Sequence, residues 1–391
     1  MIVDNQAAQE VKLTSVQEIS EKRICLFLAL ELSRKKWKLG FSDGKSRNWR
    51  EVTIEAQDLE RLEREVEKAK QKFGLAPTVE VKSCYEAGRE GFWLHRWLVQ
   101  KGIGNVVVDA ASIEVNRRSR RAKTDRLDVR KLLDQLIGYW GGDHRKLTVV
   151  NVPSIESEDA RQLHREMEIL KYERTQHRTR IQSLLFTQGV DTSVSGSFLQ
   201  RLDQFRIWNG DPVPPELKAR LVREYQRMQL VEAELGELKK QQREQLRQRA
   251  TPAMEKVKLL QTLCGIAMNS SWMFVMELFG WRHFSNRRQV GAAMGATPVP
   301  YQSGDSHREQ GISRSGNRRV RSMAVEIAWC WLRFQPDSHL SRWYQSRFGH
   351  GGKRLRRIGI VALARRLMID LWRYLETGTI PKGAKLKVQI P

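Results

Sequence analysis

Apolar and polar residues alternate in short blocks over the first part of the chain, a pattern typical of strands and amphipathic helices. Strands are predicted at residues 24–30, 37–41, 49–54, 78–84 and 105–108, and helices at 57–73, 90–100 and 124–137. The first of these strands is apolar on both faces, as expected of a central strand that is buried on both sides. The order β-β-β-α-β-α-β-α predicts an α/β domain over residues 21–145, in which a meander is followed by right-handed crossovers.

A seven-residue repeat of apolar positions marks the middle of the chain, residues 146–255. The repeating residues are Leu163, Met167, Leu170, His177, Ile181 and Leu184 in its first half, and Leu217, Leu221, Met228, Leu235 and Leu238 in its second. A spacing of 3.5 residues predicts two long helices, which form either an antiparallel hairpin or a coiled coil between subunits. The second arrangement would make the protein a homo-oligomer, a dimer or a tetramer.

The last part of the chain, residues 256–391, has the pattern of shorter helices separated by glycine-containing turns. Helices are predicted at residues 284–294, 317–334 and 353–376, and an exposed Gly- and Ser-rich segment at 301–316. Residues 1–20 are polar and are expected to form a flexible tail. The predicted fold class is therefore α/β plus all-α, with a coiled-coil middle between the two.

Charge is the most informative feature of the composition. The 391 residues include 69 Lys and Arg against 45 Asp and Glu, a formal net charge of +24. No apolar stretch approaches the roughly 20 residues that a membrane span needs, and the four cysteines show no C-x-x-C spacing. These features predict a cytoplasmic protein, associated with the nucleoid, and exclude a membrane protein or a disulfide-rich scaffold.

The positive charge is concentrated in two clusters. The first lies at residues 117–131. The second lies at residues 281–366, which hold 17 Lys and Arg against 4 Asp and Glu. Arginine binds phosphate with two parallel hydrogen bonds, so these clusters predict a nucleic-acid partner, although a solvated basic surface is the simpler alternative. The candidate nucleic-acid-binding residues are Arg117, Arg118, Arg120, Arg121 and Lys123 in the first cluster, and Arg308, Arg314, Arg318, Arg319 and Arg321 in the second.

Four acidic residues lie where an α/β domain of this order would bring them together. Glu31 follows the first strand, Glu86 follows the fourth, and Asp125 and Asp128 share one face of the last helix. Four carboxylates repel one another unless cations neutralise them, and paired Mg²⁺ ions held by carboxylates promote attack on a phosphodiester. The alternatives are that Asp125 and Asp128 only stabilise the helix N-terminus, and that Glu86 is an ordinary loop residue.

The segments around these carboxylates resemble the three acidic motifs of the DEDD transposases of the insertion-sequence one-ten family. They are residues 27–31 (Phe-Leu-Ala-Leu-Glu), 85–88 (Tyr-Glu-Ala-Gly) and 123–128 (Lys-Thr-Asp-Arg-Leu-Asp). Residues 301–306 and 310–321, the second reading Gln-Gly-Ile-Ser-Arg-Ser-Gly-Asn-Arg-Arg-Val-Arg, are similar to the C-terminal transposase domain of that family. The resemblance covers residues 23–376. The family usually has Asp at the first acidic position, where this chain has Glu31.

The resemblance implies a RuvC-like N-terminal domain with an RNase H fold, which agrees with the predicted strand order. It also implies Mg²⁺ at Glu31, Glu86, Asp125 and Asp128, a DNA substrate and a bridge RNA that guides the enzyme. In that family a serine of the C-terminal domain attacks DNA and becomes joined to a 5′-phosphate. The matching residue here is Ser303, with Ser306 as the alternative nucleophile.

Three functions are consistent with these features. The first is an RNA-guided DNA transposase, a site-specific recombinase in which the carboxylates and Ser303 form one composite site. The second is a RuvC-like metal-dependent nuclease or Holliday-junction resolvase, which would use the carboxylates alone. The third is an inactive relative that only binds DNA or RNA, which would be consistent with Glu31 in place of Asp. RNA guidance depends on the resemblance alone, because basic clusters suit RNA and DNA equally.

Overall fold

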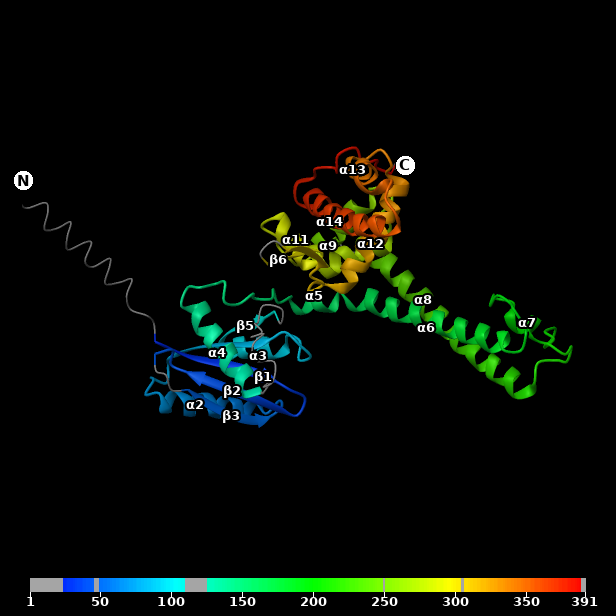
Figure 1. Ribbon diagram of the computed structural model, residues 1–391. Helices are drawn as coiled ribbons and strands as arrows, with labels where there is room; N and C mark the ends of the chain where they lie inside the picture. Colours follow the sequence, from blue (N-terminus) through cyan, green and yellow to red (C-terminus); the bar gives the residue numbers. More distant parts are fainter. Residues whose placement is uncertain (1–23, 46–48, 110–124, 249, 304–305, 388–391) are drawn as a thin grey trace, which may run out of the picture. The chain divides into compact units, whose positions relative to one another are not determined.

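The computed structural model describes residues 24–45, 49–109, 125–248, 250–303 and 306–387. At residues 125–127, 299–303 and 306–310 it describes the backbone only. The chain divides into two compact units, residues 1–152 and 153–391 (Figure 1). The first unit contains a mixed sheet with helices, and the second is almost entirely helical, so the predicted combination of α/β and helical parts is confirmed.

The first unit contains a five-stranded sheet with the strand order β3-β2-β1-β4-β5. Its strands are β1 (Cys25–Leu32), β2 (Lys36–Ser42), β3 (Arg50–Glu55), β4 (Glu80–Glu86) and β5 (Gly104–Val108). Strands β1, β2 and β3 form the antiparallel meander, whereas β4 lies parallel to β1 and β5 lies parallel to β4. The mixed α/β topology predicted from the hydrophobic pattern is therefore present.

Helices cover both faces of this sheet. They are α2 (Leu59–Lys72), α3 (Trp93–Gln100) and α4 (Asp125–Trp140). Side chains alternate along β1, so Leu26, Leu28 and Leu30 pack on the side of α2 and α3, while Phe27 and Ala29 pack against α4. This double burial explains why β1 is apolar at every position as far as Leu30.

The second unit begins with a pair of long helices. After the short α5 (Ile155–Asp159), α6 (Gln162–Phe186) packs along α8 (Pro215–Gln248), as Figure 1 shows. Met167 and Leu170 contact Val231 and Leu235 near one end of the pair, and Ile181 packs near Leu221 at the other. The two helices are thus antiparallel within one chain, which is the first of the two predicted arrangements. At the far end α7 (Phe198–Leu202) closes the turn between them.

A helical core follows the long pair. Its helices are α9 (Pro252–Gln261), α10 (Met268–Phe274), η2 (Val275–Phe279), α11 (Arg287–Ala293), α12 (Arg318–Phe334), α13 (His339–Tyr344), η3 (Gln345–Gly349) and α14 (Lys353–Thr377). Fully buried side chains such as Trp272, Phe274 and Trp331 fill the space between them. The predicted helices at 317–334 and 353–376 are present almost residue for residue.

The predicted Gly- and Ser-rich loop at 301–316 is wrong for most of its length. Strands β6 (Pro298–Ser303) and β7 (Ser306–Ile312) pair there as an antiparallel hairpin. Ser303 pairs with Ser306, so only a Gly-Asp dipeptide at 304–305 separates the strands. A two-residue connection that starts with Gly is a strong hairpin signal, and it outweighs the polar composition that suggested a loop.

Candidate active site

Two of the predicted carboxylates meet at one edge of the sheet. Leu30 of β1 pairs with Tyr85 of β4, so Glu31 and Glu86 are the next residues along two adjacent parallel strands. Side chains alternate along each strand, which places both residues on the face that α4 covers. Glu31 and Glu86 line the same cavity of about 190 Å³.

Helix α4 crosses the face of the sheet obliquely. Its C-terminal half packs near β4, whereas Val129 near its N-terminus packs against Gly40 of β2. Near the end of the helix, Nζ of Lys82 lies 4.2 Å from the ring of Trp140. Further back, Sγ of Cys84 lies 4.0 Å from the carbonyl oxygen of Leu132. Asp128 is half-buried and lies one turn before Leu132, and it does not line the cavity that Glu31 and Glu86 share.

The spacing along α4 places both aspartates on the sheet-facing side of the helix. Val129, Leu132, Leu133 and Leu136 form its buried stripe. Asp128 precedes Leu132 by four residues, and Asp125 precedes Val129 by four, so both positions continue this stripe toward the N-terminus. Asp125 is the first residue of α4, and its side chain lies outside the described part of the structure.

The donor atoms at this edge fit a divalent cation in type. Carboxylate oxygens are the ligands that Mg²⁺ prefers. Within the residues that the structure describes, no group of three or more His, Cys, Asp or Glu side chains is arranged to hold a metal ion. Magnesium binding thus stays a prediction, and it depends on the carboxylate of Asp125.

The same cavity contains charged residues that the sequence motifs did not single out. Arg34, Arg89 and Glu90 line it together with Glu31 and Glu86. Nη2 of Arg89 donates to Glu90 at 3.3 Å, and Nε1 of Trp93 donates to the other oxygen of Glu90 at 3.3 Å. Glu90 is therefore held by its neighbours. Its position four residues after Glu86 was the available signal, but no motif pointed to it.

The predicted basic residues differ in what the structure shows of them. The residues Arg117, Arg118, Arg120, Arg121 and Lys123 lie outside the described part, as does the side chain of Arg308. Arg314 and Arg318 are exposed. Nε of Arg319 donates to Glu168 at 2.8 Å, and Nη1 of Arg321 donates to the carbonyl of Met294 at 3.0 Å.

Arg319 and Arg321 thus hold parts of the fold together. Burial lowers the pKa of Arg321, and the charges of Arg314 and Arg318 lower it further. Arg314, Arg318 and Arg321 thus lie close to one another near the start of α12, an arrangement that favours an anionic partner.

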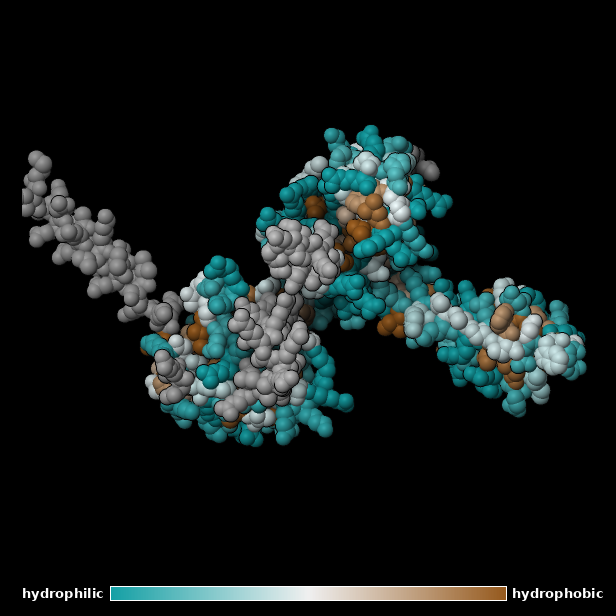
Figure 2. Space-filling view, viewed as in Figure 1, coloured by the Kyte–Doolittle hydropathy of each residue, from teal (hydrophilic) through white to brown (hydrophobic). Residues whose placement is uncertain are grey.

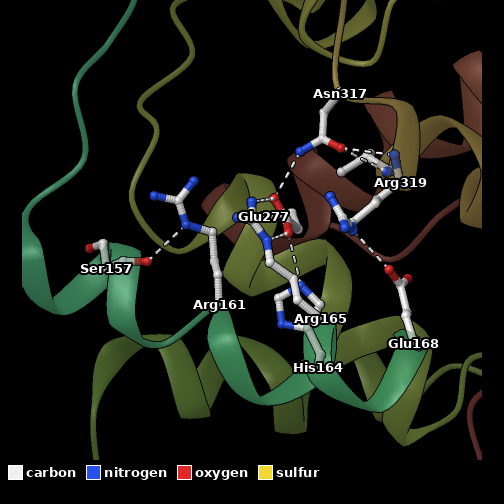
Figure 3. A network of polar contacts seen from close by, with 9 residues as sticks. Ser157, Arg161, His164, Arg165, Glu168, Glu277, Asn317 and Arg319 are labelled. Carbon is white, nitrogen blue, oxygen red and sulfur yellow. Dashed lines mark hydrogen bonds and ion pairs between the residues drawn. The ribbon is translucent and has the colours of Figure 1, made fainter. Parts of the chain in front are cut away.

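A buried carboxylate that the sequence analysis missed organises the second unit (Figure 3). Glu277 of η2 is fully buried, and Nε2 of His164 lies 2.9 Å from its Oε1. Arg165 donates from Nε at 2.7 Å and from Nη2 at 2.9 Å, one bond to each carboxylate oxygen. Nδ2 of Asn317 donates to Oε2 at 2.9 Å. The carboxylate therefore joins α6, η2 and the start of α12.

The ionisation of Glu277 follows from this network. Burial alone would raise its pKa, but the hydrogen bonds from His164, Arg165 and Asn317 and the charge of Arg165 lower the pKa well below its ordinary value. The same pairing raises the pKa of Arg165. Glu277 and Arg165 hence form a buried ion pair at neutral pH.

Asn317 also links this network to the end of α11. Its Oδ1 accepts hydrogen bonds from the backbone N–H groups of Arg319 and Val320 at 2.9 and 3.2 Å, which caps α12. Its own N–H donates to the carbonyl of Ala293 at 2.8 Å. A Cβ atom on the preceding Gly316 would lie 2.1 Å from the nitrogen of Gly295, so only glycine fits there. The Ser-Gly-Asn-Arg-Arg run is therefore explained in part by packing.

The candidate nucleophiles lie at the opposite end of the hairpin from this network. Ser303 ends β6 and Ser306 begins β7, and the two residues face each other in the strand register. Their side chains lie outside the described part. The backbone therefore places both serines next to the two-residue connection and does not distinguish between them.

Comparison with known proteins places this chain among the transposases. Residues 257–344, from α9 to α13, match the model of the Transposase IS116/IS110/IS902 family. The putative transposase y4rJ of Sinorhizobium fredii (strain NBRC 101917 / NGR234) is 37% identical over 383 residues, which cover 93% of this chain and 94% of that protein. The putative transposase y4qE of the same organism is 26% identical over 295 residues, covering 75% and 67%.

The chain belongs to the IS116/IS110/IS902 family of transposases. The predicted membership of this transposase family is thereby confirmed, whereas the assignment of the acidic motifs stays a prediction. Glu277, the hairpin and Asn317 all lie inside the matched region. Among the described residues, no helix is both long and apolar enough to cross a membrane.

We predict that Glu277→Gln destabilises the second unit, because it removes the charge that compensates Arg165. Breaking a buried ion pair costs about 3 kcal/mol, which corresponds to a fall in melting temperature of roughly 8 °C for a unit of this size. Circular dichroism of the full chain at pH 7 measures the change. Glu326→Gln, which alters an exposed glutamate of α12, is the control and should shift the melting temperature by less than about 2 °C.

The same variant should change how stability depends on pH. A carboxyl whose pKa is lower in the folded than in the unfolded state stabilises the fold above about pH 4.3 and loses this contribution as the pH falls. The wild-type melting temperature should therefore drop more steeply between pH 5 and 3 than that of Glu277→Gln. Parallel pH profiles would show that Glu277 is not the ionised centre of the network.

Proposed function

We propose that this transposase cuts and exchanges DNA strands, with the acidic edge of the first unit and a serine of the second acting on the same phosphodiester. The observation that supports this most strongly is that Glu31 and Glu86, at the same edge of the sheet, line one cavity. Carboxylate oxygens are the ligands that Mg²⁺ prefers.

The nucleophile we propose is the hydroxyl of Ser303. Its Oγ attacks a backbone phosphorus, the Oγ–P bond forms, and the bond from phosphorus to the 3′-oxygen of the neighbouring nucleotide breaks. The serine proton is lost and a proton is gained by the departing 3′-oxygen, which leaves a 3′-hydroxyl and a serine joined to a 5′-phosphate. Attack by a 3′-hydroxyl of another strand reverses the step and releases Ser303, which completes the exchange.

Glu31, Glu86, Asp125 and Asp128 are the residues that would hold Mg²⁺. Bound there, the ion would supply a positive charge that stabilises the charge on the phosphate oxygens as the bonds change. The protein contributes the strand pairing that fixes Glu31 beside Glu86, and the helix that carries both aspartates on its sheet-facing stripe. The arginines around α12 attract the DNA backbone and orient it.

We predict that Ser303→Ala abolishes a covalent protein–DNA adduct that Ser306→Ala retains. The assay incubates protein with labelled DNA and Mg²⁺, denatures it and counts the label that migrates with the protein. The two serines are register partners in one hairpin, so Ser306→Ala is a matched control for effects on the fold.

The outcome of this assay separates three functions. An adduct that requires Ser303 supports the proposal. Mg²⁺-dependent cleavage that is unaffected by Ser303→Ala would instead support a RuvC-like nuclease. No cleavage by the wild type, together with retained DNA binding, would support the inactive relative.

A guide RNA is the further element of the proposal, and the net charge of +24 supplies the electrostatic basis for it. We predict that the full chain, purified from cells that carry its complete mobile element, retains one defined RNA with segments complementary to donor and target DNA. Sequencing of the co-purified nucleic acid checks this. Recovery of unselected cellular RNA, in proportion to its abundance, would contradict guidance.

A further inference from the structure

We propose that a groove along α14 binds a single strand of DNA and leads it toward the β6–β7 hairpin. The groove has a volume of about 1280 Å³ and is lined by α11, α13, α14, the segment at 379–382 and the foot of the hairpin. Figure 2 shows apolar surface on this part of the molecule, surrounded by hydrophilic residues. Of the predicted nucleic-acid-binding residues whose side chains the structure describes, namely Arg314, Arg318, Arg319 and Arg321, none lines it.

The groove is strongly cationic, and few of its cations are neutralised by an acidic partner. Nine of the described Lys and Arg side chains line it, against one described acidic residue, Asp370. Among the described residues only one of the nine, Arg373, forms an ion pair, at 3.5 Å from Asp370. Folded proteins rarely gather that many unpaired cations in one concavity without an anionic ligand. Burial and the neighbouring charges of Arg347 and Arg365 lower the pKa of Arg366, so a bound phosphate would relieve this repulsion.

The floor of the groove is apolar, which distinguishes it from a surface that binds only phosphates. Trp343, Ile358, Val361 and Ile369 line it, and Ile358 is 51% exposed. The guanidinium of Arg366 stacks on the ring of Trp343, 3.9 Å from the ring centre, so the stacked pair brings a cation and an aromatic side chain together in the groove. Unstacked bases pack on such surfaces while the backbone follows the cations.

This combination favours a single strand over a duplex. A duplex presents its phosphates outward and keeps its bases stacked inside, so it would cover the cations but leave the apolar floor exposed to water. DNA rather than RNA is the expected ligand because the groove adjoins the hairpin that carries the proposed DNA nucleophile.

The groove connects with the proposed nucleophile through the hairpin. Pro298, Gly311 and Ile312 lie at the foot of the hairpin and line the groove. Ser303 is at the other end of β6, about 17 Å of extended strand away. This role rests on the proposed function. The groove would hold the DNA strand on one side of the cut and keep it near the hairpin while strands are exchanged.

The test measures binding without cleavage, using full-length protein that carries Ser303→Ala. The probe is a fluorescein-labelled single-stranded DNA of about 20 nucleotides, followed by fluorescence anisotropy at about 150 mM salt. Arg357→Gln with Arg366→Gln removes two exposed groove cations. The matched control, Arg220→Gln with Arg247→Gln, removes two exposed arginines of α8.

We expect the groove variant to bind single-stranded DNA at least tenfold more weakly, with a shallower salt dependence because about two phosphate contacts are lost. The control variant should change the affinity less than about threefold. Trp343→Leu should weaken binding about tenfold with little change in salt dependence, since it removes a stacking surface and no charge. Duplex DNA and single-stranded RNA of the same sequence should bind the unmodified groove more weakly than single-stranded DNA.

Equal losses of affinity for single-stranded DNA in the groove and control variants would overturn the proposal, because they would show that the substitutions act only through the overall charge of the protein. Binding of duplex DNA or RNA at least as tight as single-stranded DNA, and sensitive to the same groove substitutions, would overturn it as well. Failure of the serine mechanism gives a different pattern. The binding of single-stranded DNA would then still depend on Arg357, Arg366 and Trp343, while the wild-type protein would form no adduct on Ser303.

Discussion

The parallel pairing of β1 with β4 is the constraint on which the acidic site depends. Parallel neighbours end at the same edge of a sheet, and the register Leu30–Tyr85 makes Glu31 and Glu86 adjacent there. Antiparallel pairing would place these two residues at opposite edges. Helix α4 covers the same face of the sheet and carries Asp128 on its sheet-facing side. The described side chains of Glu31, Glu86 and Asp128 do not by themselves form a group arranged to hold a metal ion, so the chemistry that we propose depends on Asp125 as well.

The two units concentrate side chains of opposite charge. The first gathers carboxylates at a small cavity, and the second gathers unpaired arginines along a much larger groove. Within the second unit, the buried Glu277 organises the surroundings of the hairpin, since it binds the long helix α6 and also Asn317 at the start of α12. A rigid helical core with one hairpin standing on it suits a nucleophile that must reach a phosphate held by separate cations.

Most of the fold could be predicted from the sequence, because β1 is an uninterrupted apolar run as far as Leu30 and the apolar residues of α12 recur at helical spacing. Glu31 and Glu86 could be placed at one edge of the sheet because each lies at the end of a strand with a clear apolar pattern, while the role predicted for them and for Asp128 stays a prediction. The hairpin was missed because serine and glycine dominate its sequence, although the two-residue connection was a usable signal. Glu277 could not have been found, since its partners His164 and Arg165 lie more than 110 residues away in sequence. The groove arginines belong to a basic segment that was visible, but the apolar floor depends on packing between helices.

The most direct test of this account is to locate a divalent cation on the protein. Crystals of the full chain soaked with Mn²⁺, a substitute for Mg²⁺ that scatters anomalously, would show where it binds. The account predicts an anomalous peak about 2.2 Å from carboxylate oxygens of Glu31 and Glu86, with Asp125 or Asp128 completing the ligand set. That peak should be absent from Glu86→Gln crystals. A well-occupied cation elsewhere, with none at this edge in the wild type, would contradict it.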